Sequence, residues 1–258
     1  MGNRVRVVLF AVLSLGVALA CGASLAMAQG TKEETEAQST TQSTKEKTTA
    51  QSKYTDTFPP EEYLTTGENP YFILQPGYVL ELKGKEDGEK TELTITVTNE
   101  TEVVDGVETR VVEERETKDG KLREVSRNYF VIGARTNSVY YFGEDVDFYN
   151  KKGEVTSHEG SWRSGVDGAR FGLQMPGIVL LGSRYFQEVA PEVALDRAEH
   201  VSMNEKAKTP AGSFNNCLKV KETTSLERGV EEFKLYCDGV GLVKDGPLEL
   251  TSYGYLGT

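Results

Sequence analysis

Apolar and polar residues alternate along most of this chain with a period of two, not with the 3.6-residue period of a helix. In the segment Tyr78–Leu82 every second residue is large and apolar, and in Leu93–Val97 the apolar residues alternate with threonines. Successive side chains of a strand point to opposite faces, and β-branched residues favour that conformation. These segments are therefore predicted to be half-buried β-strands.

Tight-turn dipeptides separate the alternating runs. They are Asp87-Gly88, Asp105-Gly106, Asp119-Gly120 and Lys152-Gly153. Asp-Gly suits a two-residue hairpin, because both of its residues can take a positive φ. The chain is therefore expected to fold as consecutive antiparallel hairpins.

Together these signals predict an all-β fold, an antiparallel meander that forms a strongly curved sheet or a half-open barrel of about ten strands. The expected strands lie near residues 77–84, 91–99, 107–117, 121–132, 138–149, 153–162, 184–190, 197–206, 214–224, 230–237 and 240–252. Residues 192–201 (EVALDRAEHV) fit either a short helix or a strand. No helical stripe exceeds about two turns.

The first 28 residues are typical of a secretory signal peptide. Arg4 and Arg6 precede an apolar run over residues 7–20, and the run is shorter than the roughly 18 residues that a spanning helix needs. Ala26-Met27-Ala28 is a good cleavage motif. No later segment is apolar enough to cross a bilayer, so we expect an exported mature chain that begins at Gln29.

A lipid anchor is the alternative. Leu19-Ala20-Cys21 resembles a bacterial lipobox, in which Cys21 becomes the lipidated first residue, although Ala18 stands where a large aliphatic residue is usual. The sequence favours release into the secreted, periplasmic or cell-envelope space. Attachment through Cys21 stays open.

Residues 29–68 are expected to be a disordered polar spacer, and residues 69–258 a single β domain. Up to residue 51 this stretch has no aromatic and no large aliphatic residue, so it cannot bury enough apolar surface to offset its ordering entropy. The chain carries a formal net charge of −11 and no basic cluster. An acidic surface repels phosphate backbones, which excludes nucleic-acid partners.

The segment 164–182 (SGVDGARFGLQMPGIVLLG) departs from the hairpin pattern. It is too rich in glycine for a helix and too apolar for a solvated loop. We expect it to lie across the open mouth or the concave face of the sheet. It would be either a crossover that plugs the end of the core or a lid over a ligand cavity.

Aromatic residues gather in neighbouring hairpins and beside this segment. Core packing explains most of them, but on a concave sheet such rings also stack against an apolar ligand or a sugar. The ligand-binding candidates are Tyr140, Phe142, Trp162, Phe171 and Met175. The leading hypothesis is a non-enzymatic binding or carrier domain, without a cofactor, for a small apolar or amphipathic ligand. A cell-surface structural module is a further alternative.

The chain resembles exported bacterial β-proteins in which a signal peptide and a polar spacer precede a domain opening like NPYFILQPGYVLELKG (69–84) and closing like FNNCLKVKETTSLERGVEEFKLYCDGVGLVKDG (214–246). The segment GVGLVK (239–244) is also similar to the curved sheets of lipoprotein-localisation factors. That resemblance implies a half-barrel that holds a lipid or another apolar ligand, and it implies no catalytic residue.

A secreted hydrolase or lyase is the competing hypothesis. No HExxH, CxxC, GxSxG, phosphate-binding loop or dinucleotide-binding motif is present in the sequence. A catalytic group would therefore use His158 in the segment SHEGSW with an acid such as Asp167 or Glu144. Asp145 and Asp147 are weak candidates for calcium ligands, because the loop pattern of a calcium site is missing, and no metal is expected.

Cys217 and Cys237 lie on the two strands of the last long hairpin. An oxidising compartment favours a disulfide between them. The alternation argues against it. Leu218 and Val220 define the apolar face of the first strand, and Phe233 and Leu235 define that of the second strand. That pattern puts Cys237 on the core side and Cys217 opposite, unless a bulge near Gly229 restores the register.

Overall fold

The computed structural model describes residues 54–256. The expected signal peptide, the lipidation candidate Cys21 and the spacer up to residue 53 lie outside these residues. Regular structure begins before residue 69, the expected start of the domain. Thr55 forms a bridge with Tyr185, and strands are already present at Tyr63–Leu64 and Gly67–Asn69.

The described chain is all-β, as the alternation predicts, and contains no helix. Its strands are β1 (Tyr63–Leu64), β2 (Gly67–Asn69), β3 (Phe72–Leu74), β4 (Tyr78–Glu86), β5 (Glu89–Val104), β6 (Val107–Lys118), β7 (Lys121–Gly133), β8 (Val139–Tyr149), β9 (Val155–Ser157), β10 (Trp162–Arg163), β11 (Arg170–Met175), β12 (Arg184–Phe186), β13 (Glu188–Val189), β14 (Asp196–Thr209), β15 (Gly212–Thr224), β16 (Glu232–Cys237), β17 (Gly241–Asp245) and β18 (Leu248–Tyr255).

The Asp-Gly dipeptides make the predicted turns between β4 and β7. Asp87, Asp105 and Asp119 have φ values of 50°, 52° and 49°, and the glycine after each also has a positive φ. Two consecutive residues in this region give the turn whose twist matches the flanking antiparallel strands. The turns therefore set the register of the long ribbons β4–β5, β5–β6 and β6–β7.

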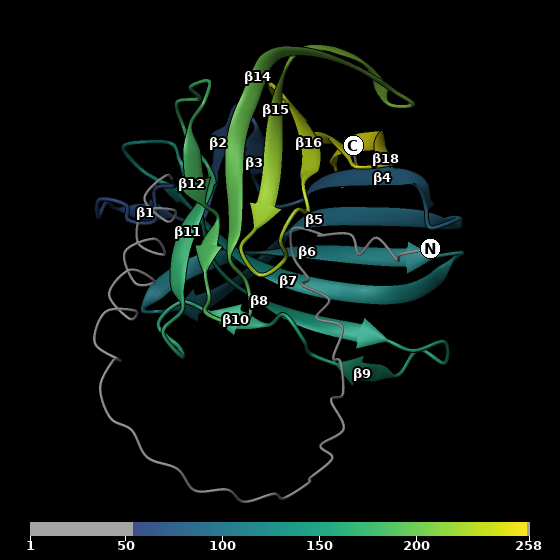
Figure 1. The fold of residues 1–258 in the computed structure, drawn as a ribbon, viewed down its shortest axis with the longest axis horizontal. Coiled ribbons are helices and arrows are strands. Elements are labelled where there is room, and N and C mark those ends of the chain that lie inside the picture. The colour runs from purple at the N-terminus through teal and green to yellow at the C-terminus, as the bar shows by residue number, and fades with distance from the viewer. Residues whose placement is uncertain (1–53, 257–258) are drawn as a thin grey trace, which may run out of the picture. The chain divides into compact units, whose positions relative to one another are not determined.

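Two antiparallel meanders, β4–β8 and β14–β18, make up the main sheet. In Figure 1 the strands β4–β7 lie nearly horizontal and β14–β16 run steeply across the view. The last strand, β18, pairs with β4 through partners such as Leu250 and Leu82, and this pairing joins the two meanders. The strand order is β12-β14-β15-β16-β17-β18-β4-β5-β6-β7-β8-β11-β13.

One seam is left in this nearly closed, barrel-like sheet, between the terminal strands β12 and β13. The two strands are consecutive, so the chain itself crosses the seam at Gln187. The Gln187 N–H donates to the Asp196 carbonyl at 2.8 Å, and the Asp196 N–H donates to Glu188 Oε1 at 2.6 Å. Hydrogen bonds therefore close the seam where strand pairing stops.

Part of the segment 164–182 is a strand. Its residues 170–175 form β11, which pairs with β8 and extends the sheet. The following loop is exposed, with Ile178, Leu180 and Leu181 at 77%, 62% and 65% of full exposure. The segment thus does not lie across a mouth as a whole. Of residues 192–201, where a helix was one alternative, 192–195 form a turn and an isolated bridge, and 196–201 belong to the strand β14.

Cys217 and Cys237 form a disulfide that joins β15 to β16. Leu218 pairs with Tyr236, so the two cysteines continue the register directly opposite each other. The faces expected for β16 were wrong: Lys234 is buried and Phe233 is 42% exposed. The charged Lys234 turns inward because buried carboxylates pair with it there. The two cysteines meet through the direct register of β15 and β16, so no bulge near Gly229 is needed.

Among residues 54–256 there is no helix with the length and hydropathy that crossing a membrane requires.

Candidate ligand-binding site

A partly open cavity of about 50 Å³ lies inside the barrel, between β3–β6 on one side and β16–β17 on the other. Most of its wall is apolar. The apolar and aromatic lining residues are Tyr71, Phe72, Ile73, Tyr78, Leu80, Leu93, Ile95, Val97, Val112, Tyr236, Val240, Gly241 and Leu242. Glu114, Gln174, Lys234 and Asp245 also line it.

The alternation of β4, β5 and β6 places the apolar wall. Leu80 pairs with Ile95, and Ile95 pairs with Glu114 on the next strand. Paired residues of antiparallel strands share a face, so one row across the sheet runs from aliphatic side chains to a buried carboxyl group. The neighbouring pair, Val97 with Val112, continues the apolar wall.

Lys234 is the cation among the cavity-lining residues, and it is fully engaged. Its Nζ lies 3.2 Å from Glu222 Oε2 and 3.8 Å from Asp245 Oδ2, and all three side chains are 2% exposed. Burial raises the pKa of the Glu222 carboxyl to about 7, although Lys234 opposes that rise. Removing either partner of such a buried ion pair would leave a buried charge without compensation, which strongly destabilises the fold.

Gln174, from β11, presents an unpaired acceptor. The residue is 2% exposed, and its Oε1 accepts no hydrogen bond from any described group. Buried carbonyl oxygens in folded proteins are nearly always paired with protein or with water. Gln174 is also one of the residues that line the cavity.

Further carboxyl groups lie buried next to this site. Burial, and then the charge of neighbouring carboxylates such as Glu124 and Glu188, raise the pKa of Glu144 well above its ordinary value. Burial next to Asp196 likewise raises the pKa of Glu188. The interior therefore contains many acids in a medium that disfavours their charge.

Three of the five predicted ligand-binding residues belong to a packed aromatic cluster. Phe142 and Phe171 stack with their ring centroids 4.5 Å apart, and Tyr140 lies edge-on to Phe171 at 6.0 Å. Phe58 and Tyr63, which precede the expected domain start, pack against these rings at 5.7 Å and 5.5 Å from Tyr140. Side chains of the segment 58–63 thus cover the surface that was predicted to bind a ligand.

The other two predicted residues lie elsewhere. Trp162 is buried edge-on to Tyr141 at 5.2 Å and borders a separate surface cavity of about 240 Å³. Met175 is 1% exposed beside Val139. None of the five residues lines the interior cavity, so the structure does not bring them together around one ligand space.

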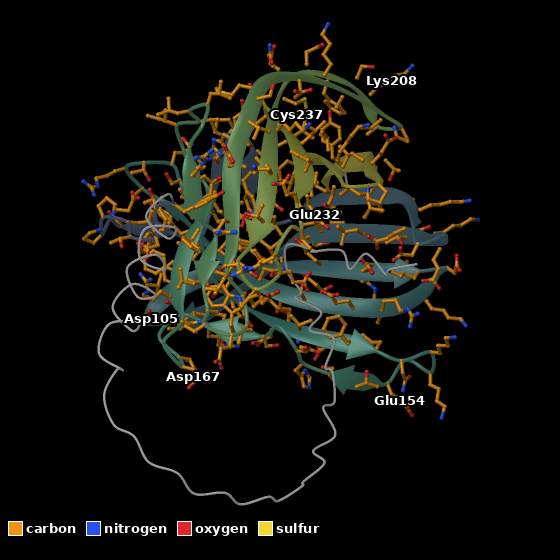
Figure 2. All side chains as sticks on the ribbon, viewed as in Figure 1. Asp105, Glu154, Asp167, Lys208, Glu232 and Cys237 are labelled. Carbon is orange, nitrogen blue, oxygen red and sulfur yellow. A yellow bond between two sulfur atoms is a disulfide. The ribbon has the colours of Figure 1, made fainter. Side chains whose placement is uncertain are left out.

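The histidine of SHEGSW is on the surface. The side chain of His158 is 70% exposed, and its Nδ1 lies 2.9 Å from Asp147 Oδ1. Glu144 is buried, whereas Asp167 lies on an exposed turn that Figure 2 shows at the edge of the fold. His158 contacts neither of these acids, so the three candidate catalytic residues do not share a site.

The two candidate calcium ligands are held by cations of the protein. Asp145 Oδ2 accepts from Arg163 at 2.6 Å and from the Tyr129 hydroxyl at 2.8 Å. Asp147 Oδ2 accepts from Arg127 at 2.8 Å. In the part of the chain that the structure describes, no group of three or more His, Cys, Asp or Glu residues is arranged to hold a metal ion.

Sequence reasoning missed Glu114, Gln174 and Lys234. Each of these three residues lies at a buried position of a strand, and the alternation predicts apolar residues at buried positions. The signal that could have found them is a charged or amide residue that alternates in phase with large apolar ones, as Lys234 does with Tyr236.

Comparison of the chain with protein-family models, with curated proteins and with solved structures gave no match.

Proposed function

We propose that this protein is an exported binding or carrier domain for a small amphipathic ligand, held in the interior cavity. The observation that carries the proposal is the combination of apolar walls with an unpaired, buried Gln174 Oε1 at a partly open cavity. Ligand sites are commonly apolar clefts with a few convergent polar groups.

The size of the cavity limits the ligand. A volume of about 50 Å³ exceeds what one water needs and is far below that of a bulky ring system. It suits the end of a single slender aliphatic chain. Tyr71, Phe72 and Ile73, like Ile95 of β5, are only partly buried, so this part of the lining lies nearer to solvent than the fully buried wall residues.

Calorimetric titration with 1-hexanol, a neutral amphiphile of this shape, tests the proposal. We expect the wild-type protein to bind it and Val97→Phe to lose binding, because the larger side chain fills the cavity. Val103→Phe is the matched control on the same strand, since Val103 is 63% exposed. Denaturant unfolding of each variant checks that it is folded. No binding of hexanol by the wild type would contradict the proposal.

Export is part of the same proposal and rests on residues 1–28 of the sequence. N-terminal sequencing of the mature protein is expected to begin at Gln29. Partition of the native protein into detergent, abolished by Cys21→Ser, would instead show the lipid-anchored form.

A further inference from the structure

The loop between β11 and β12, residues 176–183, presents large aliphatic side chains to solvent. Ile178, Leu180 and Leu181 are 77%, 62% and 65% exposed, and residues 171–183 include no charged residue. Single apolar residues on a surface are ordinary, but three within four positions form a patch of the kind that marks an interaction surface. None of the three is among the residues that line the interior cavity, so the proposed function does not use this patch.

The loop is held in its exposed position by contacts at both of its ends. At one end, Gly177 lies so close to the Thr136 carbonyl that a Cβ atom at this position would collide with it. At the other end, the Gly182 N–H donates to the His200 carbonyl at 2.8 Å. Between them Val179 is partly buried and packs against the core. A backbone that is attached to the domain therefore displays the apolar side chains.

The N-terminal segment of the chain joins the domain next to this loop. The Thr55 N–H donates to the carbonyl of Arg184, the residue that directly follows the loop, at 3.0 Å. Residues 29–51 have no aromatic and no large aliphatic side chain with which to cover the patch. Attachment to a membrane through Cys21, the alternative that the sequence leaves open, would bring this same edge of the domain to the lipid surface.

Arginines lie at both ends of the loop. Arg184 follows it directly, and Arg135 precedes Thr136, against which the other end packs; both arginines are exposed. The carboxylates that contact them are already bonded: Glu199 lies 2.6 Å from Arg184, and Glu61 accepts the Arg135 backbone N–H at 3.2 Å. Apolar side chains between basic ones match the layers of a bilayer surface, where acyl chains lie beneath lipid phosphates.

We propose that the loop 176–183 docks the domain on the surface of a lipid bilayer, with Ile178, Leu180 and Leu181 inserted below the headgroups. The lipid is zwitterionic, because the net charge of −11 opposes approach to an anionic surface. An apolar contact of this size gives weak, reversible attachment, and stable attachment takes a second signal. This interaction does not depend on a ligand in the interior cavity.

Sedimentation with phosphatidylcholine vesicles tests the docking, with the chain that begins at Gln29. The loop variant carries serine at the three exposed positions of the loop: Ile178→Ser, Leu180→Ser and Leu181→Ser. The control variant carries serine at three apolar positions elsewhere that are 63%, 44% and 37% exposed: Val103→Ser, Val155→Ser and Leu226→Ser. We expect the loop variant to bind at least about tenfold more weakly than the wild type, and the control variant to bind like it. Unfolding curves confirm that each variant is folded.

A tryptophan placed in the loop detects insertion itself. The chain's own Trp162 is 6% exposed, so a new surface indole reports its own surroundings. Emission from Ile178→Trp is expected to shift to shorter wavelength when vesicles are added, and emission from Val155→Trp is expected to stay unchanged.

Three results would overturn the inference. They are a wild type that does not sediment with the vesicles, a loop variant that binds as tightly as the wild type, and an Ile178→Trp emission that vesicles leave unchanged. A wild-type dimer in solution that the loop variant abolishes, together with no vesicle binding, would show that a second copy of the chain covers the patch.

Discussion

Glu188 and Asp196 hold the open seam of the sheet together. Glu188 Oε1 accepts the backbone N–H of Asp196 at 2.6 Å, and both residues are buried. The bond connects β13, which lies at one end of the strand order, to β14, next to the other end. A side chain thus replaces the ladder bond that strand pairing does not supply here.

Replacing Glu188 tests this connection. Glu188→Ala leaves the buried Asp196 N–H without its acceptor, so we expect a loss of about 1 to 3 kcal/mol in the free energy of unfolding. Glu188→Gln keeps an acceptor oxygen and is expected to stay within about 1 kcal/mol of the wild type. Urea unfolding at pH 7 measures both. Equal losses in the two variants would show that the hydrogen bond is not what matters.

Glu222 predicts how stability depends on pH. Burial raises the pKa of its carboxyl from 4.5 to about 7, so the folded state binds a proton that the unfolded state releases. Its contribution to stability is therefore complete below about pH 4.5 and is lost as the pH rises toward 7, by about 3 kcal/mol.

The measurement for Glu222 is the free energy of unfolding between pH 4.5 and 7.5 for the wild type and for Glu222→Gln. The amide cannot ionise, so the difference between the two proteins should shift in favour of the variant as the pH rises. A difference that is constant across this range would contradict the raised pKa.

His200 predicts a change of the opposite sign. The residue is 1% exposed, and its Nε2 lies 2.9 Å from the Tyr185 hydroxyl. Burial lowers the pKa of the imidazole from 6.5 to about 4, so acid favours the unfolded chain, which takes up the proton first. We expect His200→Gln to reduce the loss of stability between about pH 6.5 and pH 4, measured by the same unfolding curves.

The disulfide between Cys217 and Cys237 closes a hairpin with a sequence separation of 20. Closing a loop of that length lowers the conformational entropy of the unfolded chain, which stabilises the folded state by about 3 kcal/mol. The double variant Cys217→Ser, Cys237→Ser is expected to lose about that amount, and the wild type measured in reductant should match it. Stability that does not change on reduction would mean that the bond adds nothing to the fold.

Tyr63 tests whether the segment before residue 69 belongs to the domain. Its ring lies edge-on to Phe142 at 5.6 Å and to Phe171 at 6.2 Å. Tyr63→Ala should cost about 2 kcal/mol, because the side chain is half-buried. Tyr63→Phe keeps the ring and should cost less than about 1 kcal/mol. Thermal unfolding of the three proteins compares them, and an alanine variant as stable as the wild type would show that this segment is dispensable.

The strands and turns of this protein could be predicted from its sequence, because their causes are local. Alternation of period two determines a strand wherever it occurs, and Asp-Gly at 87–88, 105–106 and 119–120 determines a tight turn that aligns its neighbours. The pairing of Cys217 with Cys237 could be proposed because one hairpin contains both, although the alternation argued against it.

Only the tertiary structure decided what lies inside. Alternation separates the two faces of a strand. It does not say which face is buried when both faces carry polar and apolar residues. On β16 the buried face holds Lys234 because Glu222 and Asp245, from the two neighbouring strands, can pair with it there. Closure of the sheet by Leu82 of β4 and Leu250 of β18 likewise depends on contacts between residues far apart in sequence. The cavity and the unpaired Gln174 follow from these long-range pairings, so no local pattern could predict them.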